Sequence, residues 1–209
     1  VSFNVLEKEC EELNKIFFYY VSQGLPYVMM KYAMTLDGKI ATSAGQSKWI
    51  TGEIARQKEH QDRSRFMAIM IGVETLILDD PQLSVRLEKG KNPIRIICDT
   101  HLRSPLASKI VSTATEIPTI IATAESDPEK QAPFLKAGCE IILVSCLEGR
   151  LNLKELTKKL GEKEIDSIIL EGGGTLNASA LKAGIVQKVQ TYIAPKIFGG
   201  KEAPSPVEG

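Results

Sequence analysis

Ser167-Ile-Ile-Leu-Glu-Gly-Gly-Gly-Thr-Leu-Asn177 predicts a buried strand, a tight turn and the start of a helix. The apolar run 168–170 is typical of a strand, and Thr175 is a suitable N-cap for the helix that should follow. Three glycines at 172–174 let an anionic ligand approach the main chain, and the helix N-terminus offers unpaired N–H groups that favour phosphate. The spacing is neither G-x-G-x-x-G nor a P-loop, so a glycine-rich turn without a ligand remains an alternative.

The composition is that of an ordinary globular domain without a strong net charge. The chain has 209 residues, which suits one domain, with 43% hydrophobic and 25% charged residues. Lys plus Arg and Asp plus Glu each number 26, so no overall field attracts nucleic acid or an anionic membrane. We therefore expect neither partner, and any bound anion must be held by local groups.

The four cysteines are far apart and form no C-x-x-C pair, and the only histidines are His60 and His101. This spacing predicts no metal site. Cys98 and Cys139 lie in or beside apolar runs, as buried reduced thiols do, which favours a reducing, cytoplasmic location. The sequence shows no run long enough to span a membrane and no leader pattern at its start.

The first segment predicts one amphipathic helix over residues 7–21, ended by Gly24 and Pro26. Its apolar residues recur at steps of three and four: Leu6, Cys10, Leu13, Phe17 and Tyr20. The stripe could pack on the core of this domain or belong to the end of a preceding domain, and the sequence leaves both open.

Residues 27–33 predict a buried strand that carries one charge, Lys31. Since side chains alternate along a strand, Lys31 should share a face with the small Ala33. Lys31 is either an edge-strand residue that extends to water or a cation held at a site. Thr51 should cap the next helix, on which Arg56, His60 and Arg63 share one face; a solvated basic face is the ordinary explanation of that pattern.

The remaining pattern alternates strands with helices of about ten residues, which predicts an α/β fold with a largely parallel sheet. Strands are expected at 67–72, 94–98, 119–123, 140–145 and 188–194, with helices at 134–137, 152–160 and 175–183. Ligands of such sheets bind at the carboxyl ends of the strands. The residues at or near those ends are Lys31, Ala33, Gly72 to Thr75, Asp99, Thr100 and Glu171 to Gly174.

Several motifs occur in an order found in one known family. They are the segments 31–41 and 47–51, His60 with Arg63, Gly72 with Thr75, the segment 79–86, the segment 171–177 and Ala194-Pro195-Lys196. Over nearly its whole length the chain resembles the reductase domain of the bifunctional riboflavin-biosynthesis deaminase/reductase. The resemblance implies a dihydrofolate-reductase-like three-layer α/β sandwich and NADPH-dependent reduction of 5-amino-6-(5-phosphoribosylamino)uracil to the ribitylamino compound.

The same resemblance implies a domain organisation. Residues 1–24 would be a connector helix from a missing deaminase domain, and residues 25–209 a reductase domain that ends before the last strands of the family's sheet. We also expect a homo-oligomer.

Roles for individual residues follow from the matching motifs. Facing the substrate would be Ser47, Arg63, Leu83, Arg86 and Glu171. Facing NADPH would be Ala33, Trp49, Thr51, Thr75, Asp79, Thr100, Gly173, Gly174, Thr175, Leu176 and Asn177. The planar guanidinium groups of Arg63 and Arg86 suit the substrate phosphate, because arginine can bond a phosphate bidentately.

The expected reaction delivers a hydride to C1′ of the ring-opened ribosylamine, which requires a nearby proton donor. Lys31 would be that donor or an electrostatic support, with Asp79 and Glu171 orienting the ligands. Asp99 could bond a ribose hydroxyl, as in NAD sites, whereas Thr100, His101 and Arg103 could receive a 2′-phosphate. Two alternatives to this function remain: a related reductase acting on the diaminopyrimidinone analogue or a folate, and a non-catalytic nucleotide-binding module.

Overall fold

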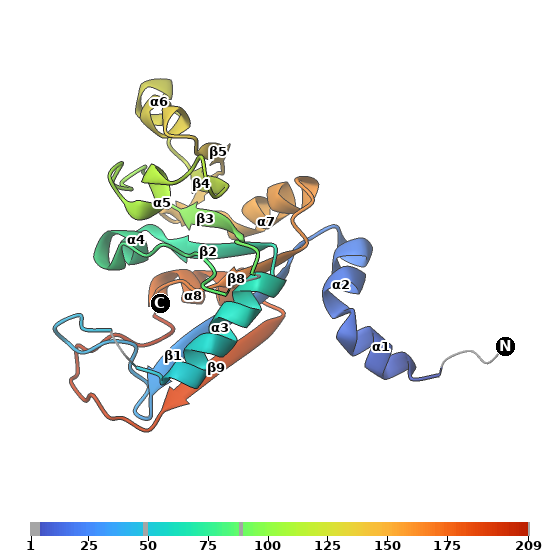
Figure 1. The fold of residues 1–209 in the computed structure, drawn as a ribbon. Coiled ribbons are helices and arrows are strands. Elements are labelled where there is room, and N and C mark those ends of the chain that lie inside the picture. The colour runs from blue at the N-terminus through green and yellow to red at the C-terminus, as the bar shows by residue number, and fades with distance from the viewer. Residues whose placement is uncertain (1–4, 48–49, 88–89, 209) are drawn as a thin grey trace.

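The computed structural model describes residues 5–47, 50–87 and 90–208, and its centre is a seven-stranded sheet (Figure 1). The helices are α1 (Glu7–Leu13), α2 (Lys15–Gln23), α3 (Glu53–Arg65), α4 (Val73–Asp79), α5 (Lys109–Ser112), α6 (Pro128–Lys136), α7 (Leu153–Glu162) and α8 (Gly174–Lys182). The strands are β1 (Tyr27–Thr35), β2 (Ala68–Gly72), β3 (Ile94–Cys98), β4 (Thr119–Thr123), β5 (Glu140–Leu143), β6 (Cys146–Leu147), β7 (Arg150–Leu151), β8 (Ser167–Leu170) and β9 (Lys188–Ala194).

The strand order is β5-β4-β3-β2-β8-β1-β9, and every neighbouring pair is parallel. The short strands β6 and β7 form a separate antiparallel hairpin. The predicted α/β class with a mostly parallel sheet is therefore confirmed. Predicted and observed bounds agree at β3, β4 and β9, whereas β5 ends two residues early and α6 begins six residues before its predicted start.

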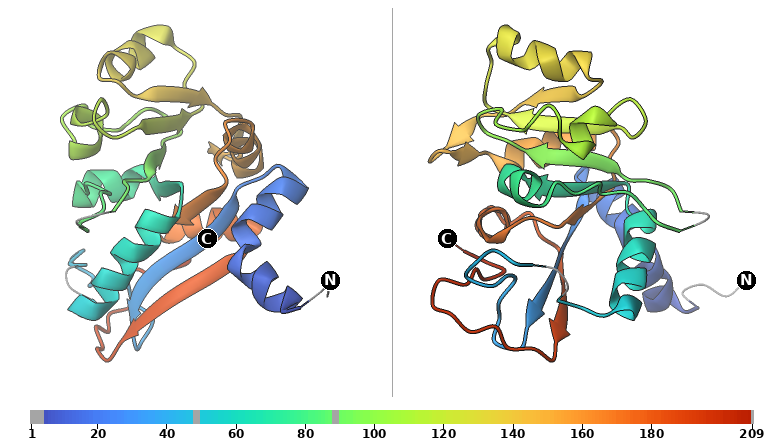
Figure 2. Two further views of the ribbon diagram at one scale, coloured as in Figure 1. Left: turned by 45° about the vertical axis from the view of Figure 1, so that its right-hand side comes forward. Right: turned by 60° about the vertical axis from the view of Figure 1, so that its left-hand side comes forward.

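The two faces of the sheet carry separate apolar cores, which gives three layers (Figure 2). Ile69, Ile71 and Ile97 pack under α4, α5 and α6. Met70 and Ile96, which alternate with them along the same strands, pack under α7 and α8. This alternation is the period of two that a strand imposes on its side chains.

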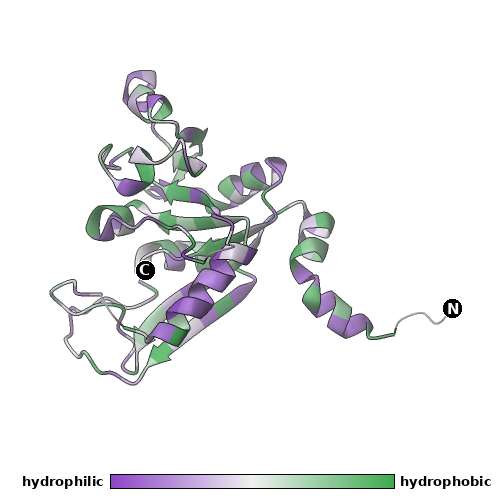
Figure 3. Ribbon diagram, in the orientation of Figure 1, coloured by the Kyte–Doolittle hydropathy of each residue, from purple (hydrophilic) through white to green (hydrophobic). Residues whose placement is uncertain are grey.

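Helix α3 differs from the other covering helices because it has almost no apolar face. Its sequence is polar throughout, and Figure 3 shows it as largely hydrophilic against apolar strands. Its one large apolar residue, Ile54, is 85% exposed, and its one buried residue is Asp62. Burial of apolar area therefore does not hold α3 on the sheet.

The predicted N-terminal helix is two helices, because the chain breaks at Asn14 between α1 and α2. Gly24 ends α2 in the left-handed conformation, as expected. The predicted stripe does not face the core: Leu13 and Phe17 are exposed, and Ile16 and Tyr19 pack against the sheet instead. Within the described residues, no helix is long and apolar enough to cross a membrane.

Both predicted threonine caps are wrong. Gly52 is the N-cap of α3 and Gly173 that of α8, each with extended backbone and no side-chain cap. At Thr51 it is the backbone carbonyl that has a partner, a guanidinium nitrogen of Arg56 at 2.9 Å.

Arg95 on β3 is a buried charge: its side chain is only 1% exposed, and hydrogen bonds satisfy its guanidinium group. Its guanidinium donates to the carbonyl oxygens of Ile110, Thr113 and Ile117 at 2.9–3.0 Å and to the Thr119 hydroxyl. The Thr113 carbonyl also accepts from the backbone N–H groups of Glu116 and Ile117, and the Ile117 carbonyl accepts from the Thr119 hydroxyl. The Ile110 carbonyl, in the short helix α5, has Arg95 as its one donor among the described residues. Burial lowers the pKa of Arg95 to about 10, so the side chain remains charged at neutral pH.

Replacing Arg95 by methionine should lower the free energy of unfolding by roughly 1–3 kcal/mol, since a buried acceptor left unpaired, here the Ile110 carbonyl, costs about that much. Urea unfolding measures this loss. The control is Arg65→Met, at an exposed position in the last turn of α3, which should change stability by less than about 1 kcal/mol. Equal losses in the two variants would show that the carbonyls find other donors.

Candidate active site

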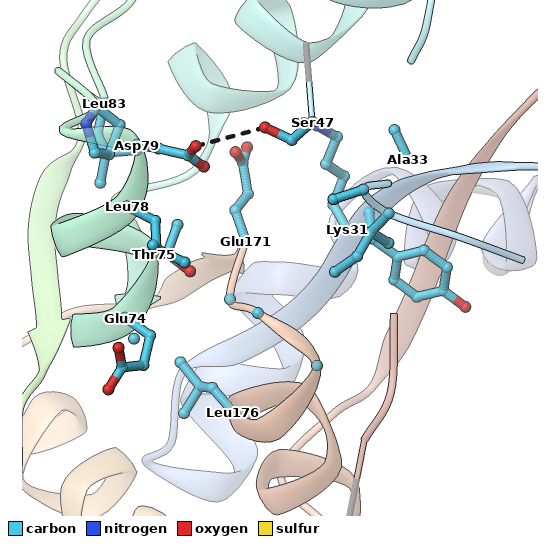
Figure 4. Close-up of a pocket in the computed structure, with 18 of the residues that line it drawn as sticks. Lys31, Ala33, Ser47, Glu74, Thr75, Leu78, Asp79, Leu83, Glu171 and Leu176 are labelled. Carbon is cyan, nitrogen blue, oxygen red and sulfur yellow. Dashed lines mark hydrogen bonds between the residues drawn. The ribbon is translucent and has the colours of Figure 1, made fainter. Parts of the chain in front are cut away.

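A cleft of about 1330 Å³ opens at the carboxyl ends of the central strands. The helices that follow the adjacent strands β2 and β8 leave to opposite faces, α4 with one core and α8 with the other. Such a divergence opens a crevice beyond the strand ends. Figure 4 shows Glu171 at the end of β8, with its carboxylate pointing toward Ser47 and Asp79.

A chain of four alternating charges lies at the floor of the cleft. Lys31 donates to one oxygen of Glu59 at 2.6 Å, and Arg63 donates to the other oxygen at 2.5 Å. Arg63 also bonds Glu171 bidentately, through Nε at 3.1 Å and Nη2 at 2.7 Å. These bonds connect β1, α3 and the end of β8.

The charges in this chain stabilise one another. Burial alone would raise the pKa of Glu171, but the charges of Lys31 and Arg63 outweigh it and hold that pKa below its usual value. Burial likewise opposes the charge of Arg63, yet Glu171 and Glu59 raise the pKa of its guanidinium. Since the folded-state pKa of Glu171 is lowered, this stabilisation is present above the unfolded carboxyl pKa and is lost as pH falls through the folded value.

Two alternatives from the sequence are therefore wrong. Lys31 is not on an edge strand, because β1 lies between β8 and β9, and the residue is 9% exposed. Arg63 is not part of a solvated basic face, because its side chain is 13% exposed and is bonded to two carboxylates. Sequence reasoning missed Glu59, although it precedes Arg63 by four residues, the spacing of a helical ion pair.

Above the floor of the cleft, the loop after α4 forms one wall and is the second part of the site. Asp80 and Leu83 have φ of 38° and 52°, an unusual left-handed backbone for residues other than glycine, and Leu83 is buried. The backbone N–H of Arg86 donates to Nδ1 of His60 at 3.4 Å, while the Arg86 side chain is exposed. Burial and the charges of Arg63 and Arg86 lower the pKa of His60, which favours its neutral form.

The third part of the site is another wall, the loop that follows β1, which lies beside the last part of the chain (Figure 1). Asp37 accepts from the Thr35 hydroxyl at 2.6 Å and from the backbone N–H groups of Phe198 and Gly199. The hydrogen bond from Thr35 and the one from Gly199 lower the pKa of Asp37 to about 2. Ser47, farther along the same loop, donates to Asp79 at 3.5 Å.

The glycine turn fits the pyrophosphate of a dinucleotide. A Cβ on Gly173 would make van der Waals contact with the Thr75 hydroxyl at 3.5 Å, so a larger side chain here would occupy space between α4 and α8. Gly173 caps α8 without a side chain, and no hydrogen bond is described from the N–H groups of Gly174, Thr175 or Leu176 within the described residues. These are the groups that bind phosphate at a helix N-terminus.

The residues after β3 decide between the two expected ways of binding the adenosine ribose: a bond from Asp99 to a ribose hydroxyl, or a 2′-phosphate held near Thr100 and Arg103. Asp99 is fully buried, accepts from the Ser104 backbone and hydroxyl at 2.7 Å, and is not in the cleft lining. It therefore cannot reach a ribose hydroxyl in this conformation. Thr100 and Arg103 do line the cleft, and Arg103 pairs with Glu74 at 2.5 Å in an exposed position.

The cleft brings together nearly all of the described residues that the sequence singled out. They are Lys31, Ala33, Ser47, Thr51, Arg63, Thr75, Asp79, Leu83, Arg86, Thr100, Glu171, Gly173, Gly174, Thr175 and Leu176. Asn177 does not line it: the residue is fully buried and donates to the carbonyl of Pro206 at 2.8 Å. Trp49 lies outside the described residues.

The lining also contains residues that sequence reasoning missed, among them Glu59, Arg150, Leu151, Leu153, Pro204 and Glu208. The β6–β7 hairpin supplies Arg150 and Leu151, and no local pattern indicated that this hairpin meets the cleft. Cys98 and Cys139 are buried free thiols, as predicted. In the described part of the chain, no cluster of three or more His, Cys, Asp or Glu could hold a metal ion.

Known proteins resemble this chain over nearly its whole length. The family model described as the RibD C-terminal domain matches residues 26–209. The riboflavin biosynthesis protein RibD of Actinobacillus pleuropneumoniae is 50% identical over 98% of this chain and 54% of its own length. A 2,5-diamino-6-ribosylamino-4(3H)-pyrimidinone 5′-phosphate reductase of Methanothermobacter thermautotrophicus is 38% identical over 88% of this chain and 84% of its own length.

A solved structure agrees in fold. The Thermotoga maritima diaminohydroxyphosphoribosylaminopyrimidine deaminase/5-amino-6-(5-phosphoribosylamino)uracil reductase superimposes with a TM-score of 0.82 at 32% identity, covering 97% of this chain and 53% of that one. This confirms the expected dihydrofolate-reductase-like architecture. The chain spans about half the length of its RibD relatives. It belongs to the RibD C-terminal domain family.

Proposed function

We propose that this domain is an NADPH-dependent reductase of riboflavin biosynthesis, which converts 5-amino-6-(5-phosphoribosylamino)uracil to 5-amino-6-(5-phosphoribitylamino)uracil. The observation that carries the proposal is one cleft with two different ends. One end offers the N-terminus of α8 behind a glycine turn, and the other offers the exposed guanidinium of Arg86 beside the buried charges. A dinucleotide and a phosphorylated small molecule would fit side by side.

Arg86 is the better candidate for the substrate phosphate. Arg63 is already bonded to Glu171 and Glu59, so its guanidinium is committed to holding the cleft together. Arg86 has no described hydrogen bond or ion pair from its side chain within the described residues. Because its donors have no described partner among the described residues, the planar guanidinium of Arg86 can bond a phosphate bidentately.

The cofactor would bind along the glycine turn. Gly173, Gly174, Thr175 and Leu176 would receive the pyrophosphate, with Thr75 opposite them. Thr100 and Arg103 would lie toward the adenosine ribose, and a 2′-phosphate could displace Glu74 from Arg103, since exposed ion pairs contribute little. This favours NADPH over NADH.

The bound dinucleotide supplies the hydride for reduction at C1′ of the ring-opened imine. Lys31, at the cleft floor, would donate a proton to the imine nitrogen or stabilise the charge that forms there. Glu171 orients the substrate because Arg63 fixes its carboxylate from one side. The hydrogen bond from Ser47 to Asp79 crosses the cleft near Glu171. Leu83 and Ala33 supply apolar surface to the cleft lining.

The alternative substrate is the diaminopyrimidinone analogue, which is in the printed name of the Methanothermobacter relative. The two substrates differ only on the pyrimidine ring and share the phosphorylated ribosylamine. Nothing that distinguishes the two rings is apparent among the described cleft residues. A non-catalytic module is disfavoured because Lys31, Asp79 and Glu171 lie in one cleft.

The test of this function is NADPH oxidation by the purified chain with each pyrimidine in turn. We expect oxidation with the uracil compound and a product with the mass of the ribityl derivative. Faster turnover of the diaminopyrimidinone would make that compound the substrate. Binding of NADPH without oxidation by either compound would identify a non-catalytic module.

We further propose that residues 1–24 connect this domain to a preceding domain and that residues 25–209 form the reductase domain. The apolar side chains of Leu13, Phe17 and Phe18 support this, because they are largely exposed to solvent although apolar surface favours burial. A cytoplasmic homo-oligomer remains a prediction. Exposed Val189 and Ile193 on the edge strand β9 are consistent with contact between copies.

Arg86→Ala should weaken substrate binding, because each charge-assisted hydrogen bond to the phosphate contributes roughly 1.5–3 kcal/mol. The KM for the pyrimidine should rise about 10-fold or more, while NADPH affinity changes little. Arg65→Ala removes an exposed arginine away from the cleft and is the control. Equal weakening of both ligands would place Arg86 in the fold or the cofactor site instead.

Gly173→Asp should abolish NADPH binding in a folded protein, because the new carboxylate would both crowd and repel a pyrophosphate at the start of α8. Fluorescence titration measures the affinity. Gly52→Asp is the matched control: it places the same residue at the N-cap of α3, where a Cβ meets nothing within 4 Å. An unchanged titration in the folded Gly173 variant would exclude the glycine turn from the cofactor site.

A further inference from the structure

Glu59 has no role in the function proposed above, yet it is the residue through which two site cations are joined. Its carboxylate accepts from Lys31 Nζ at 2.6 Å and from Arg63 Nη2 at 2.5 Å, one bond to each oxygen. The side chain is 19% exposed and lines the cleft. Both bonds are therefore partly shielded from water.

The position of Lys31 depends on this carboxylate more than on any other described group. A lysine has a flexible four-carbon stem and three donors, so its ammonium needs a partner to be held in one place. Among the described residues, the only hydrogen bond from Lys31 Nζ is to Glu59. The ammonium also lies 5.6 Å from the centroid of the Tyr192 ring and interacts with the charge of Glu171, without a described hydrogen bond to either.

Glu59 also balances charge within the cluster. Without it, Lys31 and Arg63 would share a single anion, Glu171, whose carboxylate Arg63 already bonds through both oxygens. The Lys31 ammonium would then be free to move toward that carboxylate or toward the open cleft. Either movement would change the position of the proposed proton donor.

We propose that Glu59 is a positioning residue that holds the Lys31 ammonium in place for proton donation during reduction. This rests on the function proposed above. Glu59 touches neither ligand in this account and acts through Lys31. Displacement of a catalytic group by about 1 Å can reduce the rate by as much as 10²-fold, so the effect is measurable.

The same helix provides a control for a merely structural effect. Asp62 is a buried carboxylate on α3 that is bonded to Lys58 and to Gln190 at 2.8 Å. It does not line the cleft. Asp62→Asn and Glu59→Gln thus make the same chemical change in two ion-paired acids of one helix, only one of which contacts Lys31.

Kinetics distinguish the two roles. Glu59→Gln should lower kcat about 10-fold with little change in the KM for NADPH, Glu59→Asp should recover part of the loss, and Asp62→Asn should leave kcat near the parent value. Lys31→Met should lower kcat about 100-fold. In that background Glu59→Gln should cost less than about 2-fold. The same loss in both backgrounds, or no loss in either, would overturn the proposal.

A second measurement does not depend on activity. With isotope-labelled lysine nitrogen, NMR should show a slowly exchanging ammonium signal in the parent that Lys31→Met removes. Glu59→Gln should lose this signal, and Asp62→Asn should keep it. Persistence of the signal in the Glu59 variant would overturn the proposal. If the parent gives the signal and binds NADPH but turns over neither pyrimidine, the proposed function fails while this comparison still decides what holds Lys31.

Discussion

The bidentate ion pair between Arg63 and Glu171 is the contact on which the cleft depends. Helix α3 has no apolar face to bury, so charge and hydrogen bonds hold it against the sheet. Glu59 adds a bond to β1 through Lys31, and Asp62 adds one to β9 through Gln190. One polar helix is thereby joined to three strands, and its position sets the width of the cleft.

Holding α3 by buried charges costs desolvation free energy, but it keeps charged side chains in the cleft, where a ligand can use them. Buried ion pairs often contribute little net stability because desolvation opposes their attraction. Here the two parallel hydrogen bonds fix the orientation of the Arg63 guanidinium relative to Glu171. An apolar helix would bind the sheet as strongly and leave no charge in the cleft. Lys31 and Glu171, to which α3 is bonded through Glu59 and Arg63, are also the residues proposed to face the substrate. Docking of α3 therefore also fixes the side chains of the proposed site.

The sequence predicted the sheet well because its strands are short apolar runs whose period and flanking turns are local signals. The bounds of β3, β4 and β9 needed no tertiary information. The glycine turn was also a local signal, but the predicted cap was wrong. Gly173 rather than Thr175 is the N-cap of α8, so no side chain caps the N–H groups at the start of this helix. Family resemblance, rather than periodicity, supplied most of the residues now found in the cleft.

What the sequence did not predict depends on contacts between distant segments. In the sequence, Glu59 is one of several charged residues on a polar helix. Its contact with Lys31 exists only because the fold brings α3 against β1. Asn177 was expected at the cofactor, whereas its amide holds the segment at Pro206. The apolar stripe on residues 6–20 predicted one continuous helix, but a break at Asn14 and packing through Ile16 and Tyr19 replaced it.

A double-mutant cycle between Arg63 and Glu171 tests whether this ion pair holds α3 on the sheet. Urea unfolding of Arg63→Met, Glu171→Met and the double variant gives the coupling free energy between the two side chains. If this pair seats α3, Arg63→Met should lose roughly 3–5 kcal/mol, because it removes the hydrogen-bond partner of the buried Glu171 carboxylate. Glu171→Met should lose less, because Arg63 keeps its bond to Glu59, and the double variant should lose clearly less than the sum. Losses that simply add would contradict the account and show that α3 is held on the sheet by other contacts.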